Sequence, residues 1–371
     1  MIIKDPLKTI DDFRVSPEER LESALILFDK FSPDLSAICE IDLHCHSFFS
    51  DGYLSPSAKV FEAFRRNMKA IAIADHDLFD GQLEAIKAGE IFGVDVVPAS
   101  EFYSDRPGIE IIAYFPDKKD FIEKFRSGLF NPVVEEIRSA KKEQLDKMIN
   151  RIPECFARLG FKAEITNSDI FKYVRNGLST KGDISVIMWQ KYGPELSSRG
   201  IATDVKDFQA RYTTKADMLD FALETKLDMS PSAFVERIFE WGGLAGIPHP
   251  TELRRKEGID NVGMEKVVEE LAAKGLQCIE VDGWRNGICP ETGLNQTTVF
   301  DNIRESYNRK HPERLQLLFT NGSDDHNQPG EGLELGSGRN ANLNPEFGRY
   351  ENVGRLRDRQ KLILADRKIF R

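Results

Sequence analysis

The chain of 371 residues has few cysteines and no excess of basic residues. Its five cysteines are odd in number and lack CxxC spacing, so they outline neither a disulfide framework nor a zinc finger. The formal net charge of -10 argues against a dedicated nucleic-acid surface, because phosphate binding needs a basic face. That charge still allows a local basic pocket for a small anionic substrate. With 40% apolar and 30% charged residues, the composition is that of a globular protein.

Long apolar segments are also missing. No run approaches the length of a membrane-spanning helix, and residues 1–10 contain no apolar signal segment. Cysteines without a disulfide framework fit a reducing compartment. We therefore expect a soluble, cytoplasmic protein with no membrane partner, and the sequence leaves the oligomeric state open.

Short apolar runs alternate with amphipathic segments from residue 38 onward. The runs that predict strands lie at 39–43, 70–74, 94–99, 110–115, 244–248, 277–281 and 315–320. Helices are predicted at 16–31, 56–67, 79–92, 263–274, 294–309 and 354–366. Near-continuous apolar strands separated by helices predict an α/β fold with a parallel sheet covered on both faces. Seven such strands favour closure into a barrel, in which chemistry takes place at the carboxyl ends of the strands.

The pattern changes between residues 120 and 240, where charged helical stretches follow one another without a convincing strand. We therefore expect a leading helical segment at 1–37 and a first part of the barrel at 38–119. A helical insertion at 120–240 then separates strands four and five, and 241–371 form the second part of the barrel with a C-terminal helix. Long insertions at the carboxyl face often form lids or substrate pockets.

His44 and His46 are the centre of the chemical pattern. They end an apolar strand-like run, in which residues two apart point to the same side. The turn formed by Ser50, Asp51 and Gly52 brings a carboxylate back over the same strand end. Two imidazoles and a carboxylate at one strand end predict a site for a divalent metal.

Further histidines and carboxylates fall at the ends of the other predicted strands. Five of the six histidines lie at such ends, whereas His311 lies in a polar turn. The additional strand-end residues are Asp75, His76, Asp77, Glu101, His249, Asp324 and His326. Buried carboxylates without partners are costly, and cations between them relieve that cost. Mixed imidazole and carboxylate ligands suit zinc, manganese or iron better than calcium.

The ordered motifs His-x-His…Ser-Asp-Gly, Asp-His-Asp, Glu, His-Pro and Gly-Ser-Asp-x-His resemble those of the PHP family (polymerase and histidinol phosphatase domain) of metal-dependent phosphoesterases. The resemblance covers residues 38–115 and 240–330. It implies a distorted seven-stranded β/α barrel that holds two or three divalent ions (Mn, Zn or Fe). The metal ligands that it implies are His44, His46, Asp51, His76, Glu101, His249, Asp324 and His326.

The resemblance also implies how these ligands are shared, with Glu101 bridging two ions. One site takes His44, His46 and Asp324, another takes Asp51, His76 and His326, and the third takes Glu101, His249 and one more residue. For that residue the family usually has a His or Cys shortly after strand six, whereas residues 279–290 contain no His. Either Cys289 or Asp282 substitutes for it, or the third site is weak.

The insertion resembles the substrate-contacting insertion of family members that cleave nucleotides and small phosphates. Where those members have an Arg-Pro-His stretch that holds phosphate, residues 180–185 keep a positive charge at Lys181 but have Asp183 in place of the usual His. We expect Lys181 and Arg285 to bind substrate. Asp75 and Asp77 are expected to support catalysis by orienting the metal ligands.

The reaction implied is metal-dependent hydrolysis of a phosphate ester, either a small phosphomonoester or a nucleotide, by a metal-activated hydroxide. The expected partner is therefore a small anionic phosphorylated substrate. An amidohydrolase-like C–N hydrolase stays open as an alternative, because the sequence does not separate the two cleanly. A non-catalytic metal-bound scaffold domain is a third alternative, from another class of function.

Overall fold

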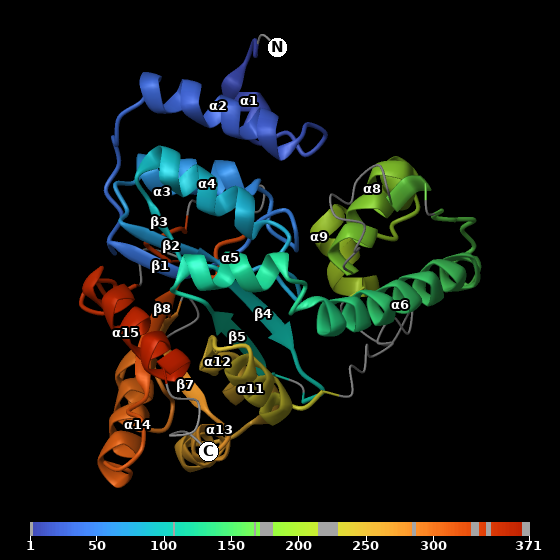
Figure 1. Ribbon diagram of the computed structural model, residues 1–371. Coiled ribbons are helices and arrows are strands. Elements are labelled where there is room, and N and C mark those ends of the chain that lie inside the picture. Colours follow the sequence, from blue (N-terminus) through green and yellow to red (C-terminus); the bar gives the residue numbers. More distant parts are fainter. Residues whose placement is uncertain are drawn as a thin grey trace. The chain divides into compact units, whose positions relative to one another are not determined.

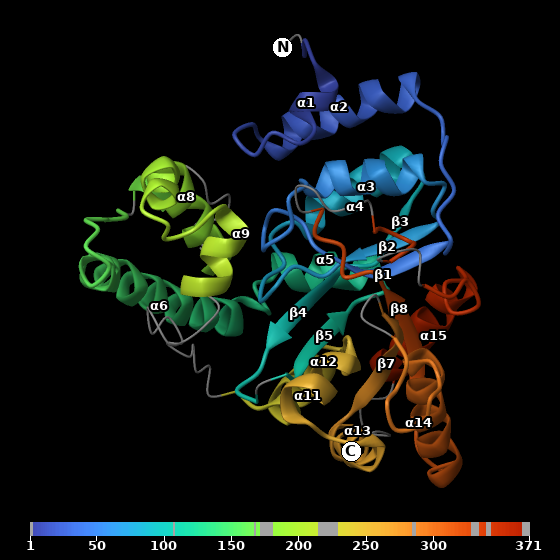
Figure 2. The ribbon, with the colours of Figure 1, turned by 180° about the vertical axis from the view of Figure 1, so that it is seen from behind.

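Figure 1 shows a computed structural model of the chain, and Figure 2 shows it from behind. The structure describes residues 3–106, 108–166, 168–170, 181–213, 229–283, 287–327, 334–338 and 343–365, without the side chains of residues 144, 181–183, 213 and 282. Among the described residues, no helix has the length and apolar character needed to cross a membrane.

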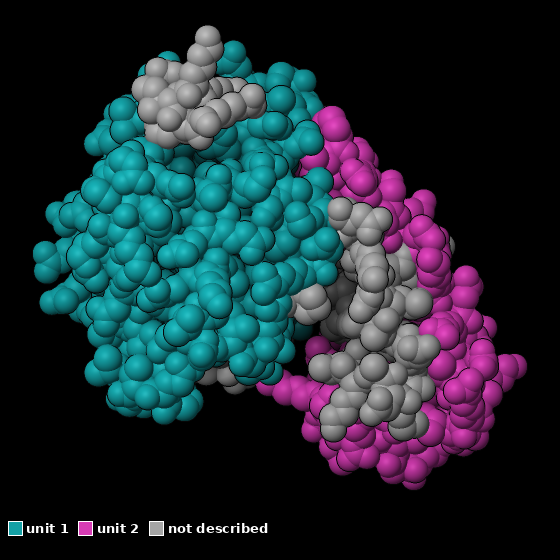
Figure 3. Space-filling view, turned by 90° about the horizontal axis from the view of Figure 1, so that it is seen from below, with its two compact units in different colours: residues 1–130, 228–371 teal, residues 131–227 magenta. Residues whose placement is uncertain are grey.

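The chain divides into two compact units, which Figure 3 shows in different colours. Unit 1 comprises Met1–Phe130 and Asp228–Arg371, and unit 2 comprises Asn131–Leu227. Unit 2 falls within the predicted insertion at 120–240 and is shorter at both ends. The difference arises because two short helices, α5 (Lys118–Arg126) and α11 (Pro231–Glu240), belong to unit 1.

Unit 1 contains two sheets. The first has the order β1 (Ile41–Cys45), β2 (Ala70–Ile73) and β3 (Asp95–Val96), all parallel. The second has the order β4 (Ala99–Tyr103), β5 (Glu110–Tyr114), β6 (Leu244–Ile247), β7 (Leu276–Gly283) and β8 (Leu318–Gly322). Isolated bridges between Cys45 and Asp325 and between His76 and Glu101 connect the two sheets.

The structure confirms the α/β class but not the closed barrel of seven parallel strands. The predicted strand at 94–99 is split into β3 and β4 around Pro98, whose nitrogen has no hydrogen to donate to a ladder. In addition, β5 runs antiparallel to both β4 and β6. The connection between β4 and β5 spans only residues 104–109, and a parallel pair needs a crossover of a dozen or more residues.

The helices agree with the sequence pattern. Those of unit 1, besides α5 and α11, are α1 (Pro6–Thr9), α2 (Pro17–Lys30), α3 (Pro56–Arg65), α4 (Gln82–Phe92), α12 (Pro250–Glu257), α13 (Asn261–Ala272), α14 (Gln296–Lys310) and α15 (Glu351–Ala365). Serine caps begin two of them: Ser16 forms a capping box with Glu19 before α2, and Ser55 accepts a hydrogen bond from the backbone of Ala58 in α3. The predicted helices at 16–31, 56–67 and 79–92 are confirmed.

Unit 2 is helical in its described residues and has its own core. It comprises α6 (Asn131–Ala157), α8 (Lys181–Ser198), α9 (Val205–Phe208) and the π-helix η1 (Gln209–Thr213). Ile152, Phe156, Ile187 and Phe208 are among the buried side chains that pack together from three of these helices. Burial of this apolar surface stabilises the unit without a sheet.

The core of unit 1 determines which way the site residues point. Ile41 and Leu43 of β1 are buried in this core together with Ala70 and Ala72 of β2. Because side chains alternate along a strand, His44 lies on the opposite face of β1 from Ile41 and Leu43. The alternation of apolar and polar residues along β1 therefore determines that His44 points away from this core.

A buried ion pair connects α2 to α4. The guanidinium of Arg20 donates two hydrogen bonds to Glu84, at 2.8 Å from Nε to Oε1 and 2.7 Å from Nη2 to Oε2. Both side chains are 3% exposed. Glu84 also accepts a hydrogen bond from the hydroxyl of Ser57. Helix α2 is thus joined to α4 by a paired charge as well as by apolar contacts.

Replacing Arg20 with Met should lower the free energy of unfolding by about 3–5 kcal/mol, because the Glu84 carboxylate is left buried without its countercharge. The value is measured by chemical denaturation of the variant and the parent protein. A loss below about 1 kcal/mol, the range of an exposed pair, would contradict the buried ion pair.

Candidate metal centre

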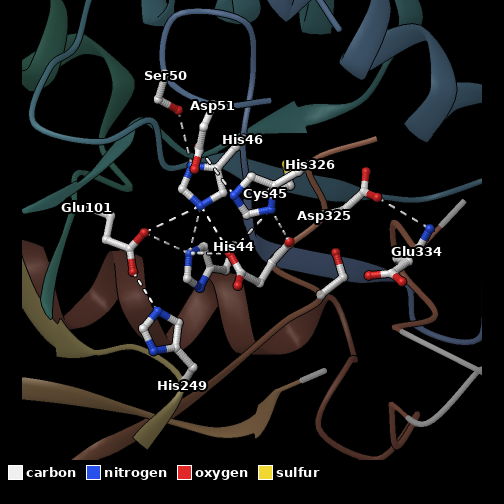
Figure 4. Close-up of polar contacts among 12 residues, drawn as sticks. His44, Cys45, His46, Ser50, Asp51, Glu101, His249, Asp325, His326 and Glu334 are labelled. Atoms are coloured by element: carbon white, nitrogen blue, oxygen red, sulfur yellow. Dashed lines mark hydrogen bonds and ion pairs between the residues drawn. The ribbon is translucent and has the colours of Figure 1, made fainter. Parts of the chain in front are cut away.

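Eight polar side chains from distant parts of the sequence meet where strands of the two sheets end. Figure 4 labels His44, His46, Asp51, Glu101, His249 and His326 among them. His44 is in β1 and Glu101 is in β4, whereas His249 directly precedes α12. Asp324 and His326 follow β8. The eight ligands predicted from the sequence are all brought together, and they form three adjacent donor groups with one added residue, Glu110.

Group 1 consists of His44, His46, Glu101 and Asp324 and is buried. The two Nε2 atoms lie 3.2 Å apart. Glu101 Oε2 lies 3.3 Å from the first and 3.4 Å from the second, and Asp324 Oδ1 lies at 3.4 and 3.1 Å. A tetrahedral site with bonds of about 2.0–2.1 Å has edges of about 3.3–3.4 Å between ligand atoms. The four donors therefore have the spacing of a tetrahedral metal site.

Hydrogen bonds to the other ring nitrogens orient both imidazoles. His44 Nδ1 donates to Glu280 Oε2 at 2.9 Å. His46 Nδ1 donates to Ser50 Oγ at 3.3 Å, and that hydroxyl in turn donates to Asp75 Oδ1 at 2.7 Å. In neutral rings this arrangement leaves a lone pair on each Nε2. Two such nitrogens 3.2 Å apart, beside two carboxylates, favour protons or a metal cation between them.

Group 2 contains Asp51, His76 and His326, with His46 at its border with group 1. His326 Nε2 lies 3.2 Å from Asp51 Oδ1, and His76 Nε2 lies 3.7 Å from Asp51 Oδ2. His326 Nδ1 donates to the carbonyl oxygen of Asp324 at 2.6 Å, which leaves Nε2 free to bind a metal. Asp51 is 32% exposed and His326 is 18% exposed, so group 2 is the side of the centre that solvent reaches.

Group 3 consists of Glu101, Glu110 and His249. His249 Nε2 lies 2.9 Å from Glu101 Oε1 and 2.9 Å from Glu110 Oε2. Glu101 thus directs one oxygen to group 3 and the other to group 1. This arrangement is consistent with the bridging role that the family resemblance implies for Glu101.

Sequence reasoning missed Glu110 because it assumed that every strand runs in the same direction. Glu110 begins β5, whereas parallel strands place functional residues at their carboxyl ends. In the antiparallel pair, however, Glu110 lies opposite Tyr103, the last residue of β4. The nine-residue spacing between Glu101 and Glu110, too short for a parallel crossover, was the available signal.

Cys289, one of the two residues proposed from the sequence for the third site, has other surroundings. Cys289 lies outside group 3, and its sulfur accepts a hydrogen bond from Arg254 Nη1 at 2.8 Å. Burial opposes ionisation of Cys289, but hydrogen bonds from Thr292 and Arg254 outweigh it and lower its pKa to about 7. The side chain of Asp282 lies outside the described residues, as do that of Lys181 and the whole of Arg285.

Asp75 and Asp77 contact the segments that carry ligands. Asp75 accepts hydrogen bonds from the backbone and hydroxyl of Ser47 at 2.7 and 2.6 Å, and from Ser50. Asp77 accepts one from the backbone of Tyr103 at 3.1 Å. Their orienting role stays a prediction, and these contacts show that it would act through the turn after β1 and the end of β4.

Two further buried carboxylates support the site and were not predicted. Glu280 of β7 accepts from His44 and, through Oε1, from the backbone nitrogen of His249 at 3.0 Å. Asp42 accepts from the backbone nitrogens of His44 and Ser323 at 3.2 and 3.0 Å. Glycine at position 322 allows this close packing, because a Cβ there would overlap that of His44.

The electrostatics of the cluster favour positive charge between its carboxylates. Burial by itself disfavours protonated imidazoles, but neighbouring carboxylates outweigh it and raise the pKa of His44 well above its ordinary value and that of His46 to about 10. Burial likewise opposes ionised carboxyls, yet the histidines hold the pKa of Glu101 and of Asp324 well below the ordinary range. Protons and metal ions would compete for the same atoms.

Comparison with known proteins agrees with this site. The model of the PHP domain matches residues 42–184, which confirms the resemblance predicted from the motifs. Three of the clustered ligands, His249, Asp324 and His326, lie beyond the matched segment. The α/β fold and the donor groups agree with this resemblance to the PHP domain.

One protein and two solved structures give the comparison more detail. Over 79 residues the chain is 37% identical to a 5'-3' exoribonuclease of Haemophilus influenzae, and the aligned part is 21% of this chain and 29% of that protein's length. A candidate metal-dependent phosphoesterase from Bifidobacterium adolescentis is similar with a TM-score of 0.58 and 22% identity, over 89% of this chain and 98% of that one. An amidohydrolase from Chromobacterium violaceum, solved with sulfate and no metal, has a TM-score of 0.55 and 20% identity over 79% and 89%. At such identities the two structures show the fold alone.

Metal affinity should fall as the pH is lowered. Since the pKa of His46 is raised to about 10, its imidazole holds a proton at neutral pH when no metal is bound, and an incoming ion must displace that proton. Titration calorimetry with Mn²⁺ in buffers of different ionisation enthalpy should show proton release, with tighter binding at about pH 8 than at about pH 6. Affinity that is independent of pH, without proton release, would contradict this electrostatic account.

Proposed function

We propose that the protein is a metal-dependent phosphoesterase that hydrolyses a phosphate ester. The observation that carries the proposal is the position of Glu101, whose two carboxylate oxygens belong to adjacent donor groups. Donor groups that share a carboxylate suit neighbouring ions, and paired ions stabilise both the attacking and the leaving oxygen of a phosphoryl group. Manganese, zinc and iron all fit the mixture of imidazole and carboxylate donors.

The three donor groups would have different roles. Groups 1 and 3 would hold ions in buried positions, and the more exposed group 2 would face the substrate. Bound divalent ions lower the pKa of water and polarise phosphoryl oxygens. Glu280 and Ser50 accept hydrogen bonds from Nδ1 of His44 and His46, which turns Nε2 of both rings toward the ions. The imidazoles and carboxylates therefore need little reorganisation before substrate binds.

Lys256 supplies a described cation at the edge of this centre. Its Nζ lies 3.8 Å from Glu110 Oε1, and its side chain is 39% exposed. An ammonium in this place would offset the negative charge of the Glu110 carboxylate in group 3. Lys181 and Arg285 remain predicted substrate-binding residues, and the role of unit 2 in substrate choice remains a prediction as well.

The substrate we propose is small and phosphorylated, either a phosphomonoester or a nucleotide. The acidic net charge of -10 disfavours long polyanions. The local identity to an exoribonuclease favours a nucleotide among small phosphates. C–N hydrolysis is the second candidate, since one fold relative is an amidohydrolase, and a metal-bound scaffold without turnover is the third.

A substrate panel separates these three functions. Phosphomonoesters, nucleotides, short oligonucleotides and amides are incubated with the manganese-loaded protein and with protein treated with a chelator. We expect release of phosphate or nucleotide that depends on metal. Cleavage of amides alone would establish the C–N hydrolase, and bound metal without turnover of any member would establish the scaffold.

Replacing His326 with Ala should reduce turnover by more than the 10–100-fold typical of residues that only orient ligands. The imidazole is a donor of group 2, yet it lies at the exposed edge, so the unfolding midpoint should change little. His311→Ala is the matched control, because this histidine lies outside the three groups and pairs with Glu313 at the surface. Equal activity of the two variants would exclude His326 from the site.

A further inference from the structure

A lysine without solvent exposure lies beside the metal centre. Lys59 belongs to α3 and is 0% exposed. Its Nζ donates to Asp325 Oδ2 at 2.7 Å, to the carbonyl oxygen of Asp325 at 3.0 Å and to Asn327 Oδ1. The three acceptors therefore belong to two residues of one short segment, which follows β8.

That segment, residues 324–327, presents two sets of side chains in opposite directions. Asp324 and His326 join groups 1 and 2, whereas Asp325 and Asn327 contact Lys59. The alternation means that the ammonium holds the residues next to each ligand without touching either ligand. Any displacement of Asp325 or Asn327 would be passed to the donor atoms through the backbone.

The backbone of this segment is unusual. Asp324 and Asn327 have φ angles of 56° and 52°, in the left-handed region, which few residues other than glycine, asparagine and aspartate adopt. Between them, the carbonyl of Asp325 accepts hydrogen bonds from both Lys59 Nζ and the backbone nitrogen of His46, the latter at 3.0 Å. Lys59 thus acts at a point where the segment is joined to the ligand-bearing end of β1.

A contribution to stability alone is a weak explanation for this ion pair. Replacing a buried ion pair with apolar side chains is often neutral or stabilising, since desolvation offsets the attraction. A fixed ammonium does position its partners, because it holds three oxygen atoms at defined distances. Burial opposes its charge, but Asp325 outweighs this effect and keeps the pKa of Lys59 above the ordinary value.

We propose that Lys59 is a positioning residue that sets the geometry of Asp324 and His326, and thereby the metal affinity of groups 1 and 2. The inference rests on the metal centre of the proposed function but on no particular substrate. Group 3, which contains neither of these ligands, should be less affected by the loss of the ammonium.

The test measures Mn²⁺ binding to purified, chelator-treated protein, with free ion followed by electron paramagnetic resonance. Lys59→Met should weaken binding at the affected sites by about 10–100-fold, the usual effect of losing a partner that orients ligands. The double variant Lys59→Met/Asp325→Leu removes both charges and should regain the unfolding midpoint of the parent protein. We expect its Mn²⁺ affinity to stay low, because the double variant still lacks the ammonium that holds the oxygen atoms of residues 325 and 327 in place.

Arg20→Met is the matched control, since it breaks a buried ion pair that contains none of the donor residues. It should lose stability and keep the parent Mn²⁺ affinity. Parent-like affinity in either Lys59 variant, or an equal loss of affinity in Arg20→Met, would overturn the positioning role while leaving the phosphoesterase proposal in place. If the parent protein itself binds no Mn²⁺, both proposals fail.

Discussion

The buried donor atoms of group 1 impose the main constraint on the structure, because placing lone pairs and negative charges together away from water costs free energy. His44, His46, Glu101 and Asp324 direct nitrogen and oxygen atoms at one point, with neighbouring atoms 3.1–3.4 Å apart. Without positive charge between them, such a cluster is strongly unfavourable. Protons on the imidazoles meet part of this need, because neighbouring carboxylates raise the pKa of His44 and of His46 above the ordinary value. A divalent cation meets it fully, and the spacing of the four donors is that of a metal site.

The fold forms this cluster by bringing together the carboxyl ends of several strands and the amino end of β5. Parallel strands supply most donors from their carboxyl ends, which is where α/β enzymes carry their active sites. The hairpin of β4 and β5 adds Glu110 from the beginning of a strand, opposite Tyr103. The result is that Glu101, in the middle of the centre, has partners on both sides. A strictly parallel barrel would have left group 3 with two of its three donors.

Much of this arrangement could be predicted from the sequence, and the failures have physical reasons. Histidines and carboxylates after apolar runs identified the eight clustered residues, because strand direction and side-chain alternation are local properties. Glu110 was missed because strand pairing is not local, and the split at Pro98 was overlooked. Lys59 could not be recognised, since a lysine in an amphipathic helix normally indicates the exposed face, and only tertiary packing buries this one. Predictions for Lys181 and Arg285 fall outside the described side chains.

The central claim is that one buried carboxylate, Glu101, is shared between metal ions. Crystals grown with manganese and measured at the manganese absorption edge would test it most directly, because anomalous scattering locates each ion without assumptions about its ligands. The account predicts separate peaks within bonding distance, about 2.0–2.3 Å, of Oε1 and of Oε2 of Glu101. The absence of any peak beside Glu101 in the presence of manganese would contradict it.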